Sequence, residues 1–306
     1  MELAKNQEHI VTIEGYGEGG MGVARIDGRV VFVHGALRGE KCRVLILKTL
    51  KSVAFAKVLE VVEPSCTRVT PDCPYFPRCG GCTYRHMSYE EELRLKKLRV
   101  QDNLARIGGS GVTVEEILGA ADTLRYRNKA QYPVSKDGKV GFYRARTHEV
   151  IECEQCLLVK SEADAAAGAL RKYMRRCRVA GYDEKTGRGL VRHLYVRSNA
   201  AGESLVCVLV NGNELPQEET LVALLRGACP KCRGIVLGTN TKKGNVILGD
   251  RYRTLWGADR LEDVLCGRVF RLSVPSFYQV NHEQAERLYA KAIEYAQLTG
   301  EETVLD

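Results

Sequence analysis

The sequence predicts an α+β protein of several domains, and three observations support this class. Short apolar runs separated by glycine-rich turns fill residues 10–62, a pattern typical of a small β-barrel. Strand-like and helix-like runs then share the middle of the chain, as in a central α/β domain. An apolar run that ends in Asp occupies residues 303–306, and the first β-strand of a Rossmann-like domain ends in this way.

Length and composition indicate an ordinary soluble protein. The 306 residues are 44% hydrophobic and 27% charged, which suits two or three domains with their own cores. No apolar run is long enough to span a bilayer, and the N-terminus lacks the apolar core of a signal peptide. We therefore expect a cytoplasmic, monomeric protein without a membrane partner.

The positive charge is concentrated in one part of the chain. The net charge is +8, and residues 120–200 contain 17 Lys and Arg but only 9 Asp and Glu. A local basic excess favours a polyanionic partner, with RNA or DNA first. A basic surface that is merely solvated explains the same charge equally well.

Five short strands are expected before residue 63, and the Asp27-Gly28 pair between two of them is a hairpin signal. A closed barrel accommodates them best, because closure removes the sheet edges. The stretch EGYGEGGMGVARIDGRVVFVHGALRGE resembles the TRAM domain, an OB-like RNA-binding barrel of RNA-modifying enzymes, which we place at residues 1–62. The expected strands are His9–Glu14, Gly22–Ile26, Arg29–Val33, Glu40–Lys48 and Ala54–Val62.

A turn-rich loop with three cysteines follows the barrel. Cys73, Cys79 and Cys82 stand among prolines and glycines in CPYFPRCGGC, which excludes a regular helix or strand. Thiolates suit an iron–sulfur cluster or zinc, and a four-coordinate site still needs one ligand. Two further CxxC pairs exist, Cys153/Cys156 and Cys229/Cys232. The residues alone leave cluster and zinc ribbon open.

A helix is expected after this loop. Ser88 and Glu91 form a capping box, apolar residues from Leu95 to Ile107 mark one face, and Gly108-Gly109 ends the helix. Its charges are read as a solvated outer face.

Cations and aromatic rings interleave in residues 124–152, where we expect an antiparallel sheet with a turn at Lys136–Lys139. Cations that reach phosphates, beside rings that stack on bases, are suited to single-stranded nucleic acid. We expect Arg125, Arg127 and Lys129 to share one strand face. An amphipathic sheet with a charged exterior is the alternative. The candidate RNA-binding residues are Arg125, Arg127, Lys129, Phe142, Tyr143, Arg144 and Arg146.

Regular elements continue to the end of the chain. A helix capped by Asn281 and running to about Leu298 precedes the apolar run Thr303–Asp306, where the sequence stops and a further domain is expected to begin. The elements expected before it are helices Ser161–Cys177 and 217–227 and strands Val191–Ser198, Ser204–Val210, Gly234–Asn240 and Asn245–Asp250.

The ordered motifs CPYFPRCGGC, RNKAQYPV, GFYRARTHEVI, ECEQCLLV, RHLYVR and SFYQVN resemble one family over essentially the whole chain. It is the S-adenosylmethionine-dependent uracil-5 RNA methyltransferases, especially the iron–sulfur branch that acts on 23S ribosomal RNA. The resemblance implies a [4Fe–4S] cluster on Cys73, Cys79, Cys82 and Cys156, with Cys153 as the competing fourth ligand. The substrate expected is ribosomal RNA, with transfer RNA as the alternative.

The resemblance also implies a cofactor contact and a mechanism. Gln279 of SFYQVN is expected to contact S-adenosylmethionine, although a role at the cap of the Asn281 helix is the alternative. In the family a cysteine thiolate adds to uracil carbon 6, carbon 5 takes the methyl group, and a base removes its proton. The family places these groups beyond Asp306, so we expect no catalytic residue in this chain and a chain that is truncated and inactive by itself.

The expected domains are interleaved along the chain. The iron–sulfur and RNA-binding domain comprises residues 63–87 and 120–270, and residues 88–119 and 271–306 belong to the methyltransferase domain. A competing hypothesis is a non-enzymatic RNA-binding protein whose second domain is stapled by a cluster or zinc.

Overall fold

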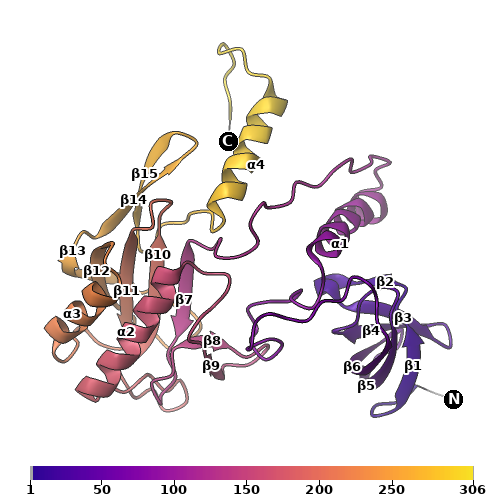
Figure 1. The fold of residues 1–306 in the computed structure, drawn as a ribbon, viewed down its shortest axis with the longest axis horizontal. Helices are drawn as coiled ribbons and strands as arrows, with labels where there is room; N and C mark the ends of the chain where they lie inside the picture. The colour runs from indigo at the N-terminus through magenta and orange to yellow at the C-terminus, as the bar shows by residue number, and fades with distance from the viewer. Residues whose placement is uncertain (1–2, 306) are drawn as a thin grey trace. The chain divides into compact units, whose positions relative to one another are not determined.

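The computed structural model describes residues 3–305, and the chain divides into two compact units. The first unit runs to Pro77 and includes Cys82–Gly119, whereas the second comprises Arg78–Gly81 and the chain from Ala120 onward. Figure 1 shows the barrel of the first unit in indigo and the central sheet of the second in magenta to orange. The expected domain boundaries group the segments differently and stay predictions.

Six strands and a short 3-10 helix, η1 (Glu18–Gly20), form the N-terminal barrel. All five expected strands are confirmed to within two residues at each end. The sheet order is β1-β5-β6-β4-β3-β2, and only the β4–β6 pair is parallel. The strands are β1 (Glu8–Thr12), β2 (Gly15–Tyr16), β3 (Gly22–Ile26), β4 (Arg29–His34), β5 (Lys41–Thr49) and β6 (Val53–Glu63).

The first stretch of chain closes this barrel. Strand β1 pairs with β5, and β2, two residues further on, pairs with β3. Between them the Glu14 backbone N–H donates to the Val23 carbonyl at 2.8 Å. Residues 8–16 therefore join both ends of the sheet, and the apolar side chains of alternating strand positions, such as Val31, Val33 and Ala56, are fully buried inside.

Helix α1 (Tyr89–Asp102) belongs to the same unit and continues into a π-helical turn, η2 (Asn103–Ile107). The Ser88 hydroxyl caps it by accepting from the Glu91 backbone N–H at 3.3 Å, as the capping box predicts. The Glu91 side chain, however, is buried and accepts from the Tyr16 hydroxyl at 3.0 Å. This carboxylate therefore anchors α1 to the barrel instead of completing the box.

A five-stranded sheet is the centre of the second unit, in the order β13-β12-β11-β10-β7. Helices α2 (Ser161–Cys177) and α3 (Glu218–Ala228) cover one face (Figure 1), and their apolar side chains share a core with that face. The helix α2 and the strands β10 and β11 are confirmed at the expected bounds. The strands are β7 (Lys129–Pro133), β10 (Val191–Ser198), β11 (Ser204–Val210), β12 (Cys232–Thr239) and β13 (Arg251–Gly257).

Smaller elements complete this unit. The hairpin β14 (Arg260–Leu265) and β15 (Arg268–Ser273) contributes Leu261 to the core on the opposite face of the sheet. Helix α4 (His282–Ala296) begins at Asn281, whose side chain accepts from the Gln284 backbone N–H at 3.2 Å. No helix within residues 3–305 combines the length and the apolar character needed to cross a bilayer.

Two of the strands expected beyond residue 240 are wrong. Residues 245–250 form an irregular loop. The Asn240 side-chain amide donates to the carbonyls of Val246 at 2.6 Å and Ile247 at 3.0 Å. A side chain therefore takes the place that a neighbouring strand would have in a sheet. Residues 303–305 are also irregular, and Leu305 is 98% exposed. No described strand pairs with them, and an isolated strand has no partner for its backbone groups. Asp306 lies outside the described residues.

Candidate functional site

Two of the predicted cluster ligands, Cys73 and Cys82, lie in the turn-rich part of the first unit. Both are half-buried. The Cys73 carbonyl accepts from the Phe76 backbone N–H at 3.2 Å, and the Phe76 ring stacks on His86 with ring centroids 5.5 Å apart. Backbone turns and one aromatic pair therefore hold the loop, as expected for a segment without regular structure.

Cys79 belongs to the second unit through the short segment 78–81. It forms a β-bridge with Arg144, and the Gly80 backbone N–H donates to the Tyr143 carbonyl at 2.9 Å. A side chain on Gly80 would press on the backbone of Ala145, so glycine permits this approach. The Cys79 sulfur also accepts from the Gly81 backbone N–H at 3.4 Å, a contact that suits a sulfur that carries negative charge.

Cys156 is held by a small polar network in the second unit. Its backbone N–H donates to the Asp164 carboxylate at 3.1 Å, and its carbonyl accepts from the Arg125 guanidinium at 2.8 Å. Arg125 also pairs with Asp164 at 2.5 Å, and the Tyr132 hydroxyl donates to the same carboxylate at 3.1 Å. Cys156 is half-buried at the end of this network, whereas Cys153 is buried.

The position of Arg125 in this network shows that one expectation about the basic residues of this segment is wrong. Strand β7 begins at Lys129, and Arg125 adopts a left-handed backbone with φ of 52°. Arg125, Arg127 and Lys129 therefore do not share one strand face. The guanidinium of Arg125 is directed inward, where an ion pair and two carbonyls accept its hydrogen bonds.

The donor set fits the predicted cluster chemically. All twelve cysteines, each within the described range, are thiols rather than disulfides, and thiolate sulfur is the ligand of iron–sulfur clusters. Within residues 3–305 no group of three or more His, Cys, Asp and Glu side chains is arranged to hold a metal ion. The ligand set therefore stays a prediction.

Arg127 and Lys129 are half-buried and lie near a second arginine that sequence reasoning missed. Strand pairing places Lys129 opposite Arg197, and burial together with the Arg197 charge lowers the pKa of Lys129. Arg197 is fully buried, and its Nε and Nη1 have no hydrogen-bond partner among the described residues. The sequence RHLYVR contained a signal for Arg197, because it places two charged residues in an otherwise apolar strand.

The other candidate RNA-binding residues lie on β8 (Gly141–Tyr143) and in the loop before β9 (Val150–Glu152). The Phe142 ring packs 4.8 Å from the buried Tyr132 ring, so it belongs partly to the core. Burial, with the nearby Glu184 carboxylate, raises the pKa of Tyr143 to about 12. Arg144 pairs with Glu149 at 2.8 Å, whereas Arg146 is exposed.

Gln279 lies just before α4, where its backbone is firmly held. The Asn128 side-chain amide donates to the Gln279 carbonyl at 2.9 Å, and the Asn128 backbone N–H donates to the next carbonyl, that of Val280, at 2.9 Å. The cap of α4 is made by Asn281 and not by Gln279. The half-buried Gln279 side chain makes no hydrogen bond within the described residues, which leaves a donor and an acceptor for a ligand.

Three comparisons relate this chain to known proteins. The TRAM domain model matches residues 4–59, which confirms the expected N-terminal domain. An uncharacterized RNA methyltransferase of Halalkalibacterium halodurans is 41% identical over 99% of this chain and 67% of its own length. Another from Clostridium acetobutylicum is 37% identical over 99% of this chain and 68% of its own length.

The fold has a counterpart among solved structures. The crystal structure of the Pyrococcus abyssi tRNA (uracil-54, C5)-methyltransferase in complex with S-adenosyl-L-homocysteine matches with a TM-score of 0.74. The match covers 93% of this chain and 64% of that one, at 22% sequence identity. The chain thus spans about two thirds of the length of the proteins that it matches.

Proposed function

The chain belongs to a family of RNA methyltransferases, and we propose that it serves in the methylation of carbon 5 of a uridine in 23S ribosomal RNA. The observation that carries this proposal is the similarity to RNA methyltransferases over 99% of the chain. The matched fold of a tRNA (uracil-54, C5)-methyltransferase supports uracil carbon 5 as the position. The resemblance to the iron–sulfur branch of the uracil-5 RNA methyltransferases favours ribosomal over transfer RNA.

S-adenosylmethionine is the proposed methyl donor, and its sulfonium supplies the methyl group that replaces the carbon 5 proton. Gln279 is proposed to contact it. The held backbone at Gln279 and Val280 orients this side-chain amide, which suits a ribose hydroxyl or an amino-acid group. No cysteine of this chain is assigned as the nucleophile.

The proposed RNA contacts come from the second unit and from the TRAM domain. Arg146 is exposed, and Tyr143, Arg144 and the half-buried Arg127 and Lys129 supply further rings and cations. Such a set binds backbone phosphates and stacks on unpaired bases. Arg125 is left out of this interface, because its hydrogen bonds are used inside the unit.

A [4Fe–4S] cluster on Cys73, Cys79, Cys82 and Cys156 is proposed as a structural staple. Methyl transfer requires no electron, and a metal centre can stabilise a loop that has little core of its own. The loop from Ser65 to Met87 fits this description, since it is made of turns and isolated bridges.

The proposal is tested in cells that lack the gene. We expect mass spectrometry of their 23S ribosomal RNA to show the loss of one 5-methyluridine, restored by the intact gene. A gene carrying Gln279→Ala is expected to restore less, and one carrying Gln297→Ala, at the exposed residue that follows α4, to restore fully. Loss of the modification from transfer RNA alone would contradict the ribosomal assignment, and loss from neither RNA would contradict the reaction.

A further inference from the structure

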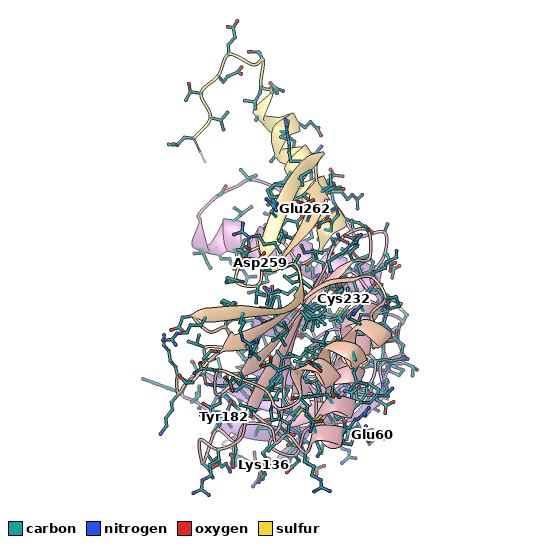
Figure 2. All side chains as sticks on the ribbon, turned by 90° about the vertical axis from the view of Figure 1, so that its left-hand side faces the viewer. Glu60, Lys136, Tyr182, Cys232, Asp259 and Glu262 are labelled. Atoms are coloured by element: carbon teal, nitrogen blue, oxygen red, sulfur yellow. The ribbon has the colours of Figure 1, made fainter. Side chains whose placement is uncertain are left out.

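One end of the second unit carries seven exposed cations outside the proposed RNA-binding loop and the cluster ligands. They come from three segments: the turn after β7, the last turn and cap of α2, and the loop before β10. We call this set the basic end. Figure 2 shows Lys136 and Tyr182 at this end of the unit, and Asp259 and Glu262 at the opposite end. The basic end consists of Lys136, Lys139, Arg175, Arg176, Arg178, Lys185 and Arg188.

Packing brings the three segments together. Gly181 lies so close to the Ser135 carbonyl that any side chain there would overlap it. The side chain of Met174 in α2 reaches to within 3.7 Å of the Cβ position of Gly138. Asp183 is held at a lowered pKa chiefly by the Lys185 backbone N–H, and the charge of Lys136 contributes. The cations therefore form one surface and not three isolated loops.

No carboxylate within the described residues forms an ion pair with any of these seven cations. The acids nearby are few, namely Asp137, Asp183 and Glu184. Glu184 is engaged by His148 at 2.7 Å and by the Tyr143 hydroxyl at 3.5 Å. Elsewhere on this unit exposed cations are commonly paired, as Arg271 is with Glu262.

The same Glu184 contacts join the basic end to the proposed RNA-binding loop. His148 and Tyr143 belong to the segment that carries Arg144 and Arg146, and both reach Glu184 in the loop before β10. The two surfaces are therefore continuous, but their chemistry differs. The two tyrosines on the segments that carry the basic end, Tyr173 and Tyr182, are buried, at 0% and 8% exposure. They therefore offer no ring on which a base could stack.

Cations without stacking rings suit a nucleic-acid backbone and not its bases. Helix α2 ends at Cys177, and Arg175 and Arg176 also complement its dipole. That explanation does not extend to Lys136, Lys139, Lys185 and Arg188, which lie on loops. Four unpaired loop cations beside the helix end indicate a polyanionic partner.

We propose that the basic end binds the phosphate backbone of an RNA duplex that flanks the target uridine, while the adjacent ring-bearing loop holds unpaired nucleotides. This inference rests on RNA as the partner in the proposed function. The basic end would give the protein a second contact with the RNA, one that depends on the shape of the duplex, because an A-form duplex is recognised mainly through its backbone.

The test compares two double variants, each of which removes two exposed cations. Lys136→Ala/Lys185→Ala removes charge from the basic end. Lys231→Ala/Arg268→Ala removes it from exposed positions outside this set. The probes are a 20-base-pair RNA duplex and a single-stranded RNA of the same length, and the dissociation constant is measured against salt concentration with each variant's melting temperature as the folding control.

The logarithm of the duplex binding constant falls as the logarithm of the salt concentration rises. We expect this fall to be shallower in the first variant, by about 0.9 in slope for each lost phosphate contact and roughly 2 in all. The control variant should keep the slope, and single-strand binding should change little in both. Equal losses in the two variants, or an unchanged duplex slope in the first, would overturn the duplex site. Failure of the unaltered chain to bind either probe would instead contradict RNA as the partner.

Discussion

Two arginines of one basic segment have different roles at the scale of single residues. Arg125 turns inward, where Asp164 and the Cys156 carbonyl accept its hydrogen bonds. Arg146, also in a left-handed backbone conformation with φ of 60°, remains exposed on its loop. Their side chains are chemically identical, so only the tertiary position separates a structural cation from a binding one.

Replacement of these arginines should separate stability from binding. Arg125→Ala leaves the Asp164 carboxylate, whose side chain is only 9% exposed, without its charge partner, which we expect to lower the free energy of unfolding by about 3 kcal/mol. Arg146→Ala, at an exposed side chain, should lower it by less than Arg125→Ala does and should weaken RNA binding. Urea unfolding and RNA titration measure both quantities. Equal stabilities for the two variants would show that the Asp164 network contributes little.

The cysteines allow an equally direct comparison. Cys156→Ser should abolish a correctly assembled cluster, because an alkoxide is a poor substitute for a thiolate ligand. Cys66→Ser, at an exposed cysteine outside the predicted set, should leave it intact. Iron and acid-labile sulfide are measured after anaerobic purification. A full cluster in the Cys156→Ser protein, or zinc without iron in the unaltered chain, would rule out the proposed ligand set.

The buried His193 should make the free energy of unfolding depend on pH. Burial, assisted by the neighbouring Arg192 charge, lowers its pKa to about 4. In the unfolded chain a histidine takes up its proton near pH 6.5. Between these values the unfolded state binds more protons, so stability is complete above pH 6.5 and falls as the pH drops towards 4.

The expected contribution of His193 to this loss is about 1–3 kcal/mol. His193→Gln should flatten the dependence of unfolding free energy on pH between 6.5 and 4. The reference is the unaltered chain, unfolded over the same pH range. A slope unchanged in His193→Gln would place the titrating group elsewhere.

At the scale of elements, local patterns predicted most strands and helices. Alternating burial in β5 and β6, and the caps at Ser88 and Asn281, are local signals, and these elements form near their expected bounds. The β14–β15 hairpin was missed. Its turn is Cys266-Gly267, with φ of 49° and 72°, and cysteine is an unusual residue at a position that favours Asn, Asp or Gly.

The candidate site was predictable to a smaller extent. The spacing of Cys73, Cys79 and Cys82 indicates a metal loop by itself, because few other structures need thiols at such intervals. The roles of Arg125 and Arg197 depend on partners far along the chain, Asp164 for the first and the Ser276 carbonyl for the second. No local pattern contains such pairings.

The β8–β9 hairpin depends on the close approach of Gly141 to the backbone of Ile151, and a substitution at Gly141 tests this dependence. A Cβ at this position would overlap the Ile151 carbonyl of the paired strand. We expect Gly141→Ala to cost about 2 kcal/mol or more of stability and to reduce RNA binding by displacing Tyr143. Gly168→Ala, inside α2 with only the end of the Arg171 side chain nearby, should instead stabilise by about 0.5–1 kcal/mol. Thermal unfolding distinguishes them, and equal effects would contradict the steric argument.

At the scale of the whole molecule, each of the two units has a main hydrophobic core of its own. The barrel core centres on fully buried residues such as Val31 and Ile46, and the α2–α3 core on Leu170, Leu194 and Leu221. The chain passes between the units at residues 77–78, 81–82 and 119–120. Separate cores generally unfold as separate cooperative transitions.

Calorimetry should therefore resolve two transitions that respond to different substitutions. Val31→Ala should lower only the barrel transition, and Leu170→Ala only the other. Each should cost about 2–4 kcal/mol in its own unit, since both remove fully buried methyl groups. A single transition that both variants shift alike would show that the units unfold as one.

The segment that closes the barrel also has a consequence for biosynthesis. Residues 8–16 leave the ribosome before one of their two partners, β5, which ends only at Thr49, and before β6, which lies between β5 and β4 and ends at Glu63. At 5–20 residues per second this is a delay of about 3–10 s. During that time residues 8–12 lack their strand partner, and such unpaired strands can pair with the wrong chain. A chaperone that binds extended apolar segments would therefore be most useful to this protein before Glu63 has emerged.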